Sequence, residues 1–424
     1  MSPRARVSVL SARTFRSLHR RNYRLYFIGQ VVSLTGTWMQ NVAQAWFIVE
    51  LTHSPLAVGL LAVCQFGPYG LLGLLGGTVA DRVNQRRLLI CTQTAFLLSA
   101  ASLATLALTG HATVWEVYLL AAINGFVLVL DTPVRQSFTI QMVGRSELPN
   151  AVALNSSIFN ASRIIGPAVA GALIAVAGVG LCFLFNAFSF VAVIVALALM
   201  RESELFAVGR DDRRANVFRG ASEGIRFAWR TPVVRTVLVM MLVISTIGIN
   251  FNVLLPVLTA RTLHSGPQVF GMLSALFGVG ALAGALTTAA LGRASARALL
   301  AGALIFSLSE LALAPMRVAW AAALVLVVTG VAFSLYASQS NATLQMSTPD
   351  RLRGRVLGIY GYVFFGTAPL GGLLAGWLAQ TGGTQLAFLV AGGAGLCAAV
   401  YGAAELRDAR APDTALTPGG LHAA

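Results

Sequence analysis

The sequence predicts an all-α membrane protein of twelve transmembrane helices, arranged as two pseudo-symmetric six-helix halves. Three observations support this fold class: the composition, the number of long apolar segments, and a residue pattern that occurs once in each half. The chain has 424 residues, of which 57% are hydrophobic and only 11% are charged. A soluble protein has about 25% charged residues, so most of this protein's surface is expected to face lipid.

The apolar segments are each long enough to cross a bilayer, which takes about 20 residues. They span residues 24–50, 55–80, 88–109, 113–137, 150–176, 178–200, 235–262, 267–292, 297–315, 318–344, 354–380 and 384–404. One long polar stretch divides them six and six. The predicted organisation is a basic N-terminal tail (1–23), an N-terminal half (24–200), a central loop (201–234), a C-terminal half (235–404) and a C-terminal tail (405–424).

The basic residues predict the orientation of the chain. All 30 of them are arginine, against 15 acidic residues, which gives a net charge of +15. They cluster in the two tails, the central loop and alternate turns, whereas the opposite side has only Arg261 and Arg317. Basic residues are in excess in cytoplasmic loops, so both termini are expected in the cytoplasm. Arginines placed between apolar segments do not form a nucleic-acid interface.

The N-terminal segment and the amino-acid composition indicate where the protein resides. The first apolar segment is much longer than the roughly 7–15 residues of a signal peptide, so we expect it to be retained as helix 1. Abundant Ala, Gly and Arg without any Lys are typical of a GC-rich bacterial genome. The expected location is therefore the bacterial inner membrane, with lipid as the surrounding partner.

The two halves share a sequence pattern. Gln136-Ser137 and Gln141-Met142 at the end of helix 4 correspond to Gln339-Ser340 and Gln345-Met346 at the end of helix 10. Each pair precedes a helix that contains glycine and proline. Duplicated halves joined by a linker suit alternating access, in which one half rocks against the other around a central site.

The turn between helices 2 and 3, residues 77–87, combines a glycine, an acid and several arginines. Such charges at helix ends can pair with each other or with a helix terminus. The turn resembles the signature loop of the major facilitator superfamily, although Asn84 stands where glycine is usual and Gln85 where a basic residue is usual. The resemblance implies a conformational latch, which would be formed by Gly77, Asp81, Arg82, Arg86, Arg87 and, in helix 4, Arg135.

Further stretches resemble one branch of this superfamily, the enterobactin-exporter-like and macrolide-efflux-like proteins. They are residues 131–136, 147–155, 163–171, 224–232 and 353–356. The resemblance implies a secondary transporter that exports small drug-like or siderophore-like molecules, and it does not specify the substrate.

Helix 5 contains a second motif, formed by Arg163, Gly166, Pro167 and Gly171. Proline bends a helix because it lacks a backbone donor, and glycine permits close approach. The motif resembles the helix-5 motif of superfamily antiporters, with Ala170 where glycine is usual, and this resemblance implies export. An uptake permease of the same fold is the alternative.

Polar side chains within the spans are candidates for the substrate path, because a polar stripe facing lipid is costly. The candidates are Thr37, Gln40 and Gln44 in helix 1, Asn160 in helix 5, Asn250 and Asn252 in helix 7, Tyr336 in helix 10 and Tyr360 in helix 11. The alternative is that these side chains form hydrogen bonds between helices.

Ionisable residues inside membrane spans are functional candidates by default. Asp131 is either a latch element, paired with Arg135 or Arg86, or the proton-coupling site. Arg163 either neutralises a neighbour or contacts an anionic substrate. We expect Glu310 to be an interface residue.

No energy source or chemistry other than ion-coupled transport is suggested. The chain has no lysine and therefore no P-loop, so ATP is not expected to drive it, and proton coupling is the remaining common possibility. The four cysteines are isolated and lack metal-site spacing. No cofactor, metal or catalytic cluster is expected, which disfavours a membrane enzyme; a channel would not accumulate substrate against a gradient.

Overall fold

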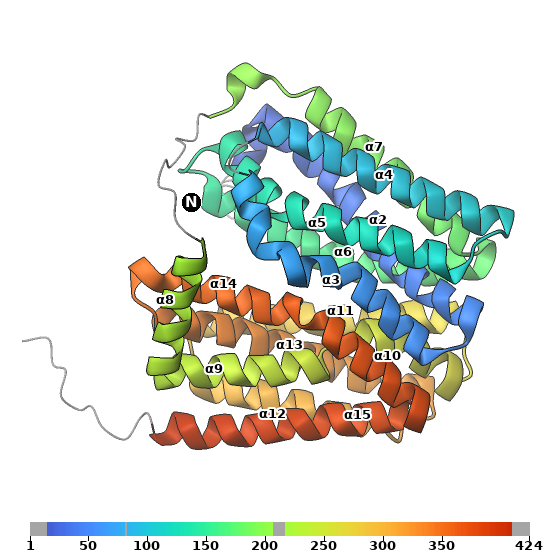
Figure 1. Cartoon of the computed structure of the whole chain (residues 1–424), viewed down its shortest axis with the longest axis vertical. Coiled ribbons are helices and arrows are strands. Elements are labelled where there is room, and N and C mark those ends of the chain that lie inside the picture. The colour runs from blue at the N-terminus through green and yellow to red at the C-terminus, as the bar shows by residue number, and fades with distance from the viewer. Residues whose placement is uncertain (1–14, 81–82, 207–216, 409–424) are drawn as a thin grey trace, which may run out of the picture.

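The computed structural model describes residues 15–80, 83–206 and 217–408, and every regular element in these ranges is a helix. The N-terminal half forms one layer of the molecule and the C-terminal half the other (Figure 1). The N-terminal half contains η1 (Arg16–His19), α2 (Arg21–Thr52), α3 (Pro55–Ala80), α4 (Gln85–Thr109), α5 (Val114–Val143), α6 (Leu148–Ala177) and α7 (Val179–Ala198).

The C-terminal half follows a short connecting helix, η2 (Glu202–Glu204). Its elements are α8 (Val217–Arg230), α9 (Pro232–Val243), η3 (Ile244–Gly248), α10 (Phe251–Val257), η4 (Leu258–Thr262), α11 (Pro267–Leu291), α12 (Ala296–Leu313), α13 (Ala319–Met346), α14 (Asp350–Gly366) and α15 (Ala368–Asp408).

The chain is a multi-pass membrane protein. Ten stretches of the described residues are long and apolar enough to cross a membrane. The last of them, Asp350–Leu406, contains two spans, because Gly382 and Gly383 interrupt the helix between them. The long helix α2, whose polar residues lower its hydropathy, is not among the ten. Dividing the last stretch and adding α2 gives the twelve helices that the sequence predicts.

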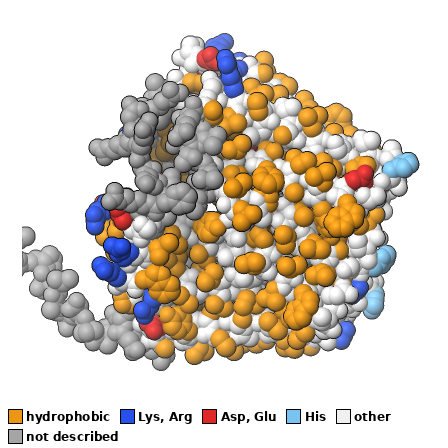
Figure 2. All heavy atoms as spheres, in the orientation of Figure 1, with side chains coloured by type: hydrophobic (Ala, Val, Ile, Leu, Met, Phe, Trp, Pro, Cys, Tyr) orange, Lys and Arg blue, Asp and Glu red, His pale blue; other side chains and the backbone are white. Residues whose placement is uncertain are grey.

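The two ends of the bundle differ in charge, and an apolar belt covers the side between them (Figure 2). We call one end the Arg-rich end; it carries the start of α2, the α3–α4 turn and α8. We call the other the His end; it carries the turns at His53, His111 and His264. Exposed apolar side chains such as Leu71, Phe188 and Leu324 belong to the belt that lipid would cover.

The two halves touch near the His end. A Cβ added at Gly59 of α3 would lie 2.6 Å from the carbonyl oxygen of Gly372 in α15. A Cβ added at Gly171 of α6 would lie 2.8 Å from the Cα of Gly271 in α11. These backbones can approach so closely only because both partners lack side chains.

Other contacts between the halves lie in the same region. Trp46 stacks on Phe270 with ring centroids 5.8 Å apart, and Arg261 donates a hydrogen bond to the carbonyl of His53. Among the described residues, the hydrogen bonds and ring contacts that join the halves lie from about the middle of the bundle to the His end, and the one nearest the Arg-rich end is the bond that the Tyr362 hydroxyl donates to the carbonyl of Gly70. Near the Arg-rich end, a Cβ added at Gly354 or Gly358 of α14 would meet nothing within 4 Å. Among the residues that the structure describes, the halves are therefore in contact from the His end to the middle of the bundle and separated near the Arg-rich end.

Two helices of the C-terminal half are interrupted, whereas the sequence predicted continuous segments 235–262 and 354–380. The first is broken between η3 and α10, where Asn250 donates to the carbonyls of Thr246 and Ile247 that the break leaves free. The second is broken at Thr367, between α14 and α15. Pro369 favours this break because it has no N–H for the carbonyl of the residue four positions earlier.

The segment predicted as a central loop contains a helix. α8 lies at the Arg-rich end beside α14, and its Gly224 and Ala228 are buried, while Trp229 on another face is exposed. Glu223 of α8 pairs with Arg355 of α14. The alternation of apolar and polar residues at helical spacing explains the helix.

Candidate functional site

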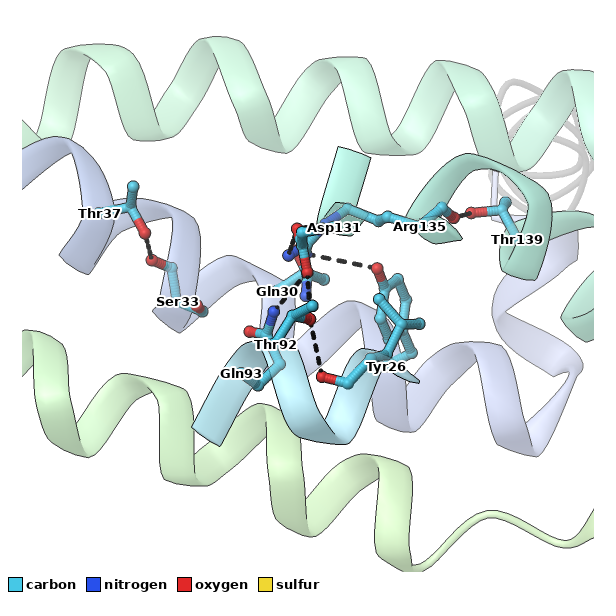
Figure 3. Close-up of polar contacts among 10 residues, drawn as sticks. Tyr26, Gln30, Ser33, Thr37, Thr92, Gln93, Asp131, Arg135 and Thr139 are labelled. Atoms are coloured by element: carbon cyan, nitrogen blue, oxygen red, sulfur yellow. Dashed lines mark hydrogen bonds and ion pairs between the residues drawn. The ribbon is translucent and has the colours of Figure 1, made fainter. Parts of the chain in front are cut away.

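A cluster of buried polar side chains surrounds Asp131 in the N-terminal half (Figure 3). Its members come from three helices: Tyr26 and Gln30 from α2, Thr92 and Gln93 from α4, and Asp131 and Arg135 from α5. Asp131 is 3% exposed. Its Oδ1 accepts hydrogen bonds from Thr92 Oγ1 and Gln93 Nε2, both at 2.8 Å.

Arg135 supplies the charge that opposes Asp131. Its Nη2 and Nε lie 2.6 and 3.0 Å from Asp131 Oδ2, one helical turn away. Its Nη1 donates to Gln30 and, at 3.4 Å, to the Tyr26 hydroxyl. Charge-assisted and forked bonds of this kind are the strong ones. The carboxylate is thus satisfied by four donors, and the cluster ties α2, α4 and α5 together. The sequence left Arg135 and Arg86 as alternative partners of Asp131, and in the structure Asp131 pairs with Arg135.

Arg86 pairs elsewhere, at the Arg-rich end of the same half. Its Nη1 lies 2.6 Å from Glu202 Oε1. Its Nε and Nη2 donate to the last carbonyls of α7, those of Leu197 and Ala198, at 2.8 and 2.9 Å. A cation at a helix C-terminus is favourable because the helix dipole is negative there. Arg86 therefore fastens α4 to α7.

The remaining predicted latch residues are less informative. Asp81 and Arg82 lie outside the described residues, and of Gly77 only its place in α3 is described. Arg87 is exposed at the start of α4, where its backbone N–H bonds to the side chain of Asn84. Asn84, the departure from the family pattern, is thus the N-cap of α4.

The helix-5 motif lies in α6 and forms two close helix contacts. Gly166 faces α2, where an added Cβ would lie 2.6 Å from the Cβ of Trp38. Gly171 faces α11 across the boundary between the halves. Pro167 is buried inside the helix between them. The motif therefore packs α6 against its own half on one face and against the other half on the next.

Arg163, the first residue of this motif, lies among aromatic rings from both halves. Its guanidinium carbon is 5.9 Å from the ring centroid of Trp38, 5.1 Å from Phe277 and 5.3 Å from Phe333. These distances allow cation–π attraction. No ion pair joins Arg163 to an acid among the described residues. The arrangement leaves the guanidinium without an opposing charge at the middle of the boundary between the halves.

A small pocket lies between α2, α3 and α10, with a cavity volume of about 20 Å³, which is room for about one water molecule. Its polar lining consists of Asn41, Gln65 and Asn252. Asn252 was predicted as a path residue. Asn41 and Gln65 were not, although Asn41 directly follows a predicted residue in the polar stripe of helix 1.

Several predicted path residues do not line this pocket. Gln40 accepts a hydrogen bond from Asn186 of α7 at 2.7 Å, and Gln44 accepts one from Gln65 at 3.2 Å. These two satisfy the alternative expectation of hydrogen bonds between helices. Asn250 caps its own helix break, and Tyr336 is fully buried in the C-terminal half.

Three further path candidates donate hydrogen bonds to backbone carbonyls of their own or a neighbouring helix. Thr37 donates to the carbonyl of Ser33, and Asn160 donates to the carbonyl of Ser156. Tyr360 of α14 donates to the carbonyl of Ala337 of α13 at 3.0 Å. Asn160 is half-buried on the part of α6 that runs toward the separated Arg-rich end, beside exposed Ser156 and Ser157. The polar residues of α6 therefore lie on the part of this helix that runs toward the Arg-rich end, where the halves are separated.

Two halves of six helices, closed at one end and separated at the other, define a membrane transporter of the major facilitator fold. Residues 12–416 match the family described as transmembrane secretion effector. The chain belongs to this family of the major facilitator superfamily, and it is a transporter and not an enzyme.

Relatives and a solved structure agree with this assignment. The chain is 29% identical over 365 residues to the multidrug efflux pump Tap of Mycolicibacterium fortuitum, covering 84% of this chain and 88% of that protein. It is 25% identical over 378 residues to the staphyloferrin A transporter of Staphylococcus aureus, covering 88% and 93%. The crystal structure of the nucleoside transporter NupG is similar in fold, with a TM-score of 0.68 at 13% identity over 91% of this chain and 98% of that one.

Proposed function

We propose that this protein exports drug-like or siderophore-like small molecules across the bacterial inner membrane by proton-coupled antiport. The observation that carries the proposal is the separation of the halves at the Arg-rich end while glycine contacts close the His end. The names of the two relatives, an efflux pump and a siderophore transporter, support the substrate class. The excess of arginine supports a cytoplasmic Arg-rich end, with both termini there.

In this proposal, the structure corresponds to the state that receives substrate from the cytoplasm. Substrate would enter between the halves along Asn160 of α6 and meet Arg163 and the polar lining at Asn252. Rocking of the halves would then open the His end. Gly77, Asp81, Arg82, Arg86, Arg87 and Arg135 would act as the latch that holds the Arg-rich end together in the opposite state.

Asp131, the candidate proton-coupling residue, is paired with Arg135 in this state. It would release Arg135 before it could accept a proton, so its contribution to coupling requires the cluster of Figure 3 to rearrange. A proton role for Asp131 and a latch role are therefore separable by experiment.

The test is accumulation of a panel of dyes, antibiotics and siderophores in an efflux-deficient bacterial host. We expect the wild type to lower accumulation of at least one compound, and a protonophore to abolish this effect. The same assay with Asp131→Asn measures the contribution of that carboxyl. Energised inverted vesicles should take up the exported compound, whereas right-side-out vesicles should not. Uptake by right-side-out vesicles alone would replace export with the permease alternative.

A further inference from the structure

Glu310 is a carboxyl group buried in the membrane region, and it has no hydrogen-bond partner in the part of the chain that the structure describes. It lies in α12, one turn before the helix ends at Leu313 near the His end. Its side chain is 0% exposed, and neither carboxyl oxygen has a hydrogen-bond partner among the described residues. Asp131, the other buried acid of the spans, accepts four hydrogen bonds. Asp131 is therefore stabilised as an ion by its donors, whereas Glu310 has no donor that could stabilise a negative charge.

Among the residues that the structure describes, no charge faces Glu310 from the elements packed around it. Arg297 is the other charged residue of α12 and lies thirteen residues away, about 20 Å along the helix. α13 contains no charged residue, and its Tyr336 lies level with Gly302, more than two turns from Glu310.

The same is true of the other neighbours. The described charged residues of α15 are near its Arg-rich end, beyond Tyr401, while the part level with Glu310 is around Gly392, which contacts Leu311. Cys397 of α15 is exposed. Segment η3 has no charged residue, and Arg235 lies at the far end of α9. An ionised carboxylate in such a place would be uncompensated, which costs far more than binding a proton. Glu310 is therefore neutral in this conformation.

The carboxyl group of Glu310 lies against the break in the seventh membrane-crossing helix. A Cβ added at Gly248, the last residue of η3, would be 3.2 and 3.5 Å from its two oxygens. The chain leaves the helical conformation at Ile249, directly after Gly248. A charge on Glu310 would thus act on the backbone where the helix is already interrupted.

This break is connected to the other interrupted helix and to the pocket. Ser245 Oγ donates to the carbonyl of Val363 at 3.2 Å and lies 3.4 Å from the hydroxyl of Thr367, where α14 ends. On the other side of the break, Asn252 lines the pocket between the halves. Discontinuous helices commonly form coupling sites in transporters. A change at Gly248 would reach both the α14–α15 break and the pocket through these direct contacts.

We propose that Glu310 carries the coupled proton, and that deprotonation of Glu310 moves the helix break between η3 and α10. The proton would bind from the His end, since Glu310 lies one turn from the end of α12. It would be given up to water in a state of the cycle that connects Glu310 with the Arg-rich side, which leaves the carboxylate until the next proton binds. This inference rests on the proposed transport function and deepens it by naming the residue that links the ion to the conformational change.

The first experiment measures protonation and needs no substrate. Infrared difference spectroscopy of purified protein at neutral pH should show the carbonyl stretch of a protonated carboxyl group. We expect this band to be lost in Glu310→Gln, whose amide has the shape of the neutral acid, and to remain in Glu204→Gln, which changes an exposed carboxyl group. A wild type without the band, or a Glu310→Gln variant that keeps it, would overturn the assignment.

The second experiment measures coupling to the conformational change. Spin labels at Ala153→Cys of α6 and Leu291→Cys of α11, in a cysteine-free background, report the separation of the halves at the Arg-rich end. We expect the distance distribution to shift between acid and alkaline pH, and this shift to be absent in Glu310→Gln and present in Glu204→Gln, which changes an exposed carboxyl group. A shift that persists in Glu310→Gln, or no shift in the parent, contradicts the proposal.

The outcomes separate this inference from the proposed export function. If the parent exports no compound of the panel but shows a Glu310-dependent shift with pH, export fails and the proton site stands. If the parent exports a dye and Glu310→Gln exports it equally well, with the same sensitivity to a protonophore, the proton site fails and export stands. Glu310→Asp serves as a second variant, and we expect it to retain part of the pH response.

Discussion

At the scale of single residues, Asp131 and Arg135 form an ion pair in which the carboxylate is buried and the guanidinium is partly exposed. Asp131 is only 3% exposed, so its carboxylate can remain ionised there only because four donors surround it. Removing one member of a buried pair is costly because the other charge is left uncompensated, whereas removing both can be nearly neutral. The pair is therefore a structural element of α5 whatever else it does.

Asp131→Asn should lower the stability of the purified protein by at most about 3–5 kcal/mol, the cost of breaking a fully buried ion pair, because the remaining Arg135 side chain is 26% exposed. The double variant Asp131→Asn/Arg135→Gln should recover most of this loss, since no unpaired charge remains. Unfolding of the four members of this double-mutant cycle in detergent measures the effect. Equal stability of Asp131→Asn and wild type would show that the pair does not hold α5 in place.

Asn252 and Gln40 are both amide side chains of the spans, but their surroundings predict different phenotypes. Asn252→Ala should change the apparent affinity for an exported dye and leave the unfolding temperature unchanged, because this side chain lines the pocket. Gln40→Ala should lower stability by roughly 1 kcal/mol, because the amide of Asn186 loses its acceptor. Dye-export kinetics and thermal unfolding distinguish them, and the reverse pattern would place the path along Gln40.

The polar residues of helix 1 illustrate what the sequence can predict at this scale. Their spacing places them on one face, and the face is indeed turned from lipid. Spacing does not say which neighbour a side chain meets, so Gln40 and Asn252 were equal candidates. The partners of Asp131 on α4, Thr92 and Gln93, carried no recognisable pattern because ordinary polar residues become partners only through the packing of α4 on α5.

At the scale of helices, the crossings of α3 on α15 and of α6 on α11 determine which state is observed. Both depend on glycines that face each other across the boundary between the halves. Close packing of backbones through small residues is a main source of helix association in lipid. The closed His end is thus held by contacts that a single methyl group would disturb.

Gly171→Ala should destabilise the closed His end, because its Cβ would lie 2.8 Å from the Cα of Gly271. The readout is the labelling rate of Ser54→Cys by a membrane-impermeant maleimide, in a cysteine-free background, and we expect a several-fold increase. Gly393→Ala is the matched control, since a Cβ there meets nothing within 4 Å. Equal labelling rates in the two variants would argue against the crossing as the closing contact.

The interrupted helices show where prediction of elements stops. Apolar content predicted the spans 235–262 and 354–380 as wholes, and the structure keeps both as membrane-crossing stretches. Apolar content is insensitive to the backbone, so the change to π-helical hydrogen bonds in η3 and η4 left no signal. Pro369 was a visible signal for the break at Thr367. The break at Ile249 depends on the carbonyls that Asn250 caps, which only the folded backbone reveals.

At the scale of the whole molecule, composition and arginine distribution predicted more than local patterns did. The number of spans, the two halves and the apolar belt all follow from where polar groups can be placed in a bilayer. The state of the transporter could not be predicted, because the same helices must pack in at least two ways. The observed state depends on a small free-energy difference between two sets of contacts that join the halves. Of these contacts, only the glycines can be recognised in the sequence.

A disulfide across the His end should stop transport. Ser54 of the N-terminal half donates a hydrogen bond to Gln380 of the C-terminal half at 3.3 Å. With native cysteines removed, Ser54→Cys/Gln380→Cys should lose dye export after mild oxidation and regain it after reduction, because the His end can no longer open. The two single-cysteine variants are the controls. Export that survives complete cross-linking would mean that the halves need not separate there.

The aromatic surroundings of Arg163 have a thermodynamic consequence. Trp38 comes from one half, and Phe277 and Phe333 come from the other, so the three rings surround the guanidinium only when the halves adopt this arrangement. A compound that binds one arrangement better than another shifts the population by that difference in affinity and no more. A flat anion that replaced Phe277 on the guanidinium would keep the two halves apart. Arg163 is accordingly a position where a molecule could arrest the cycle without itself being carried.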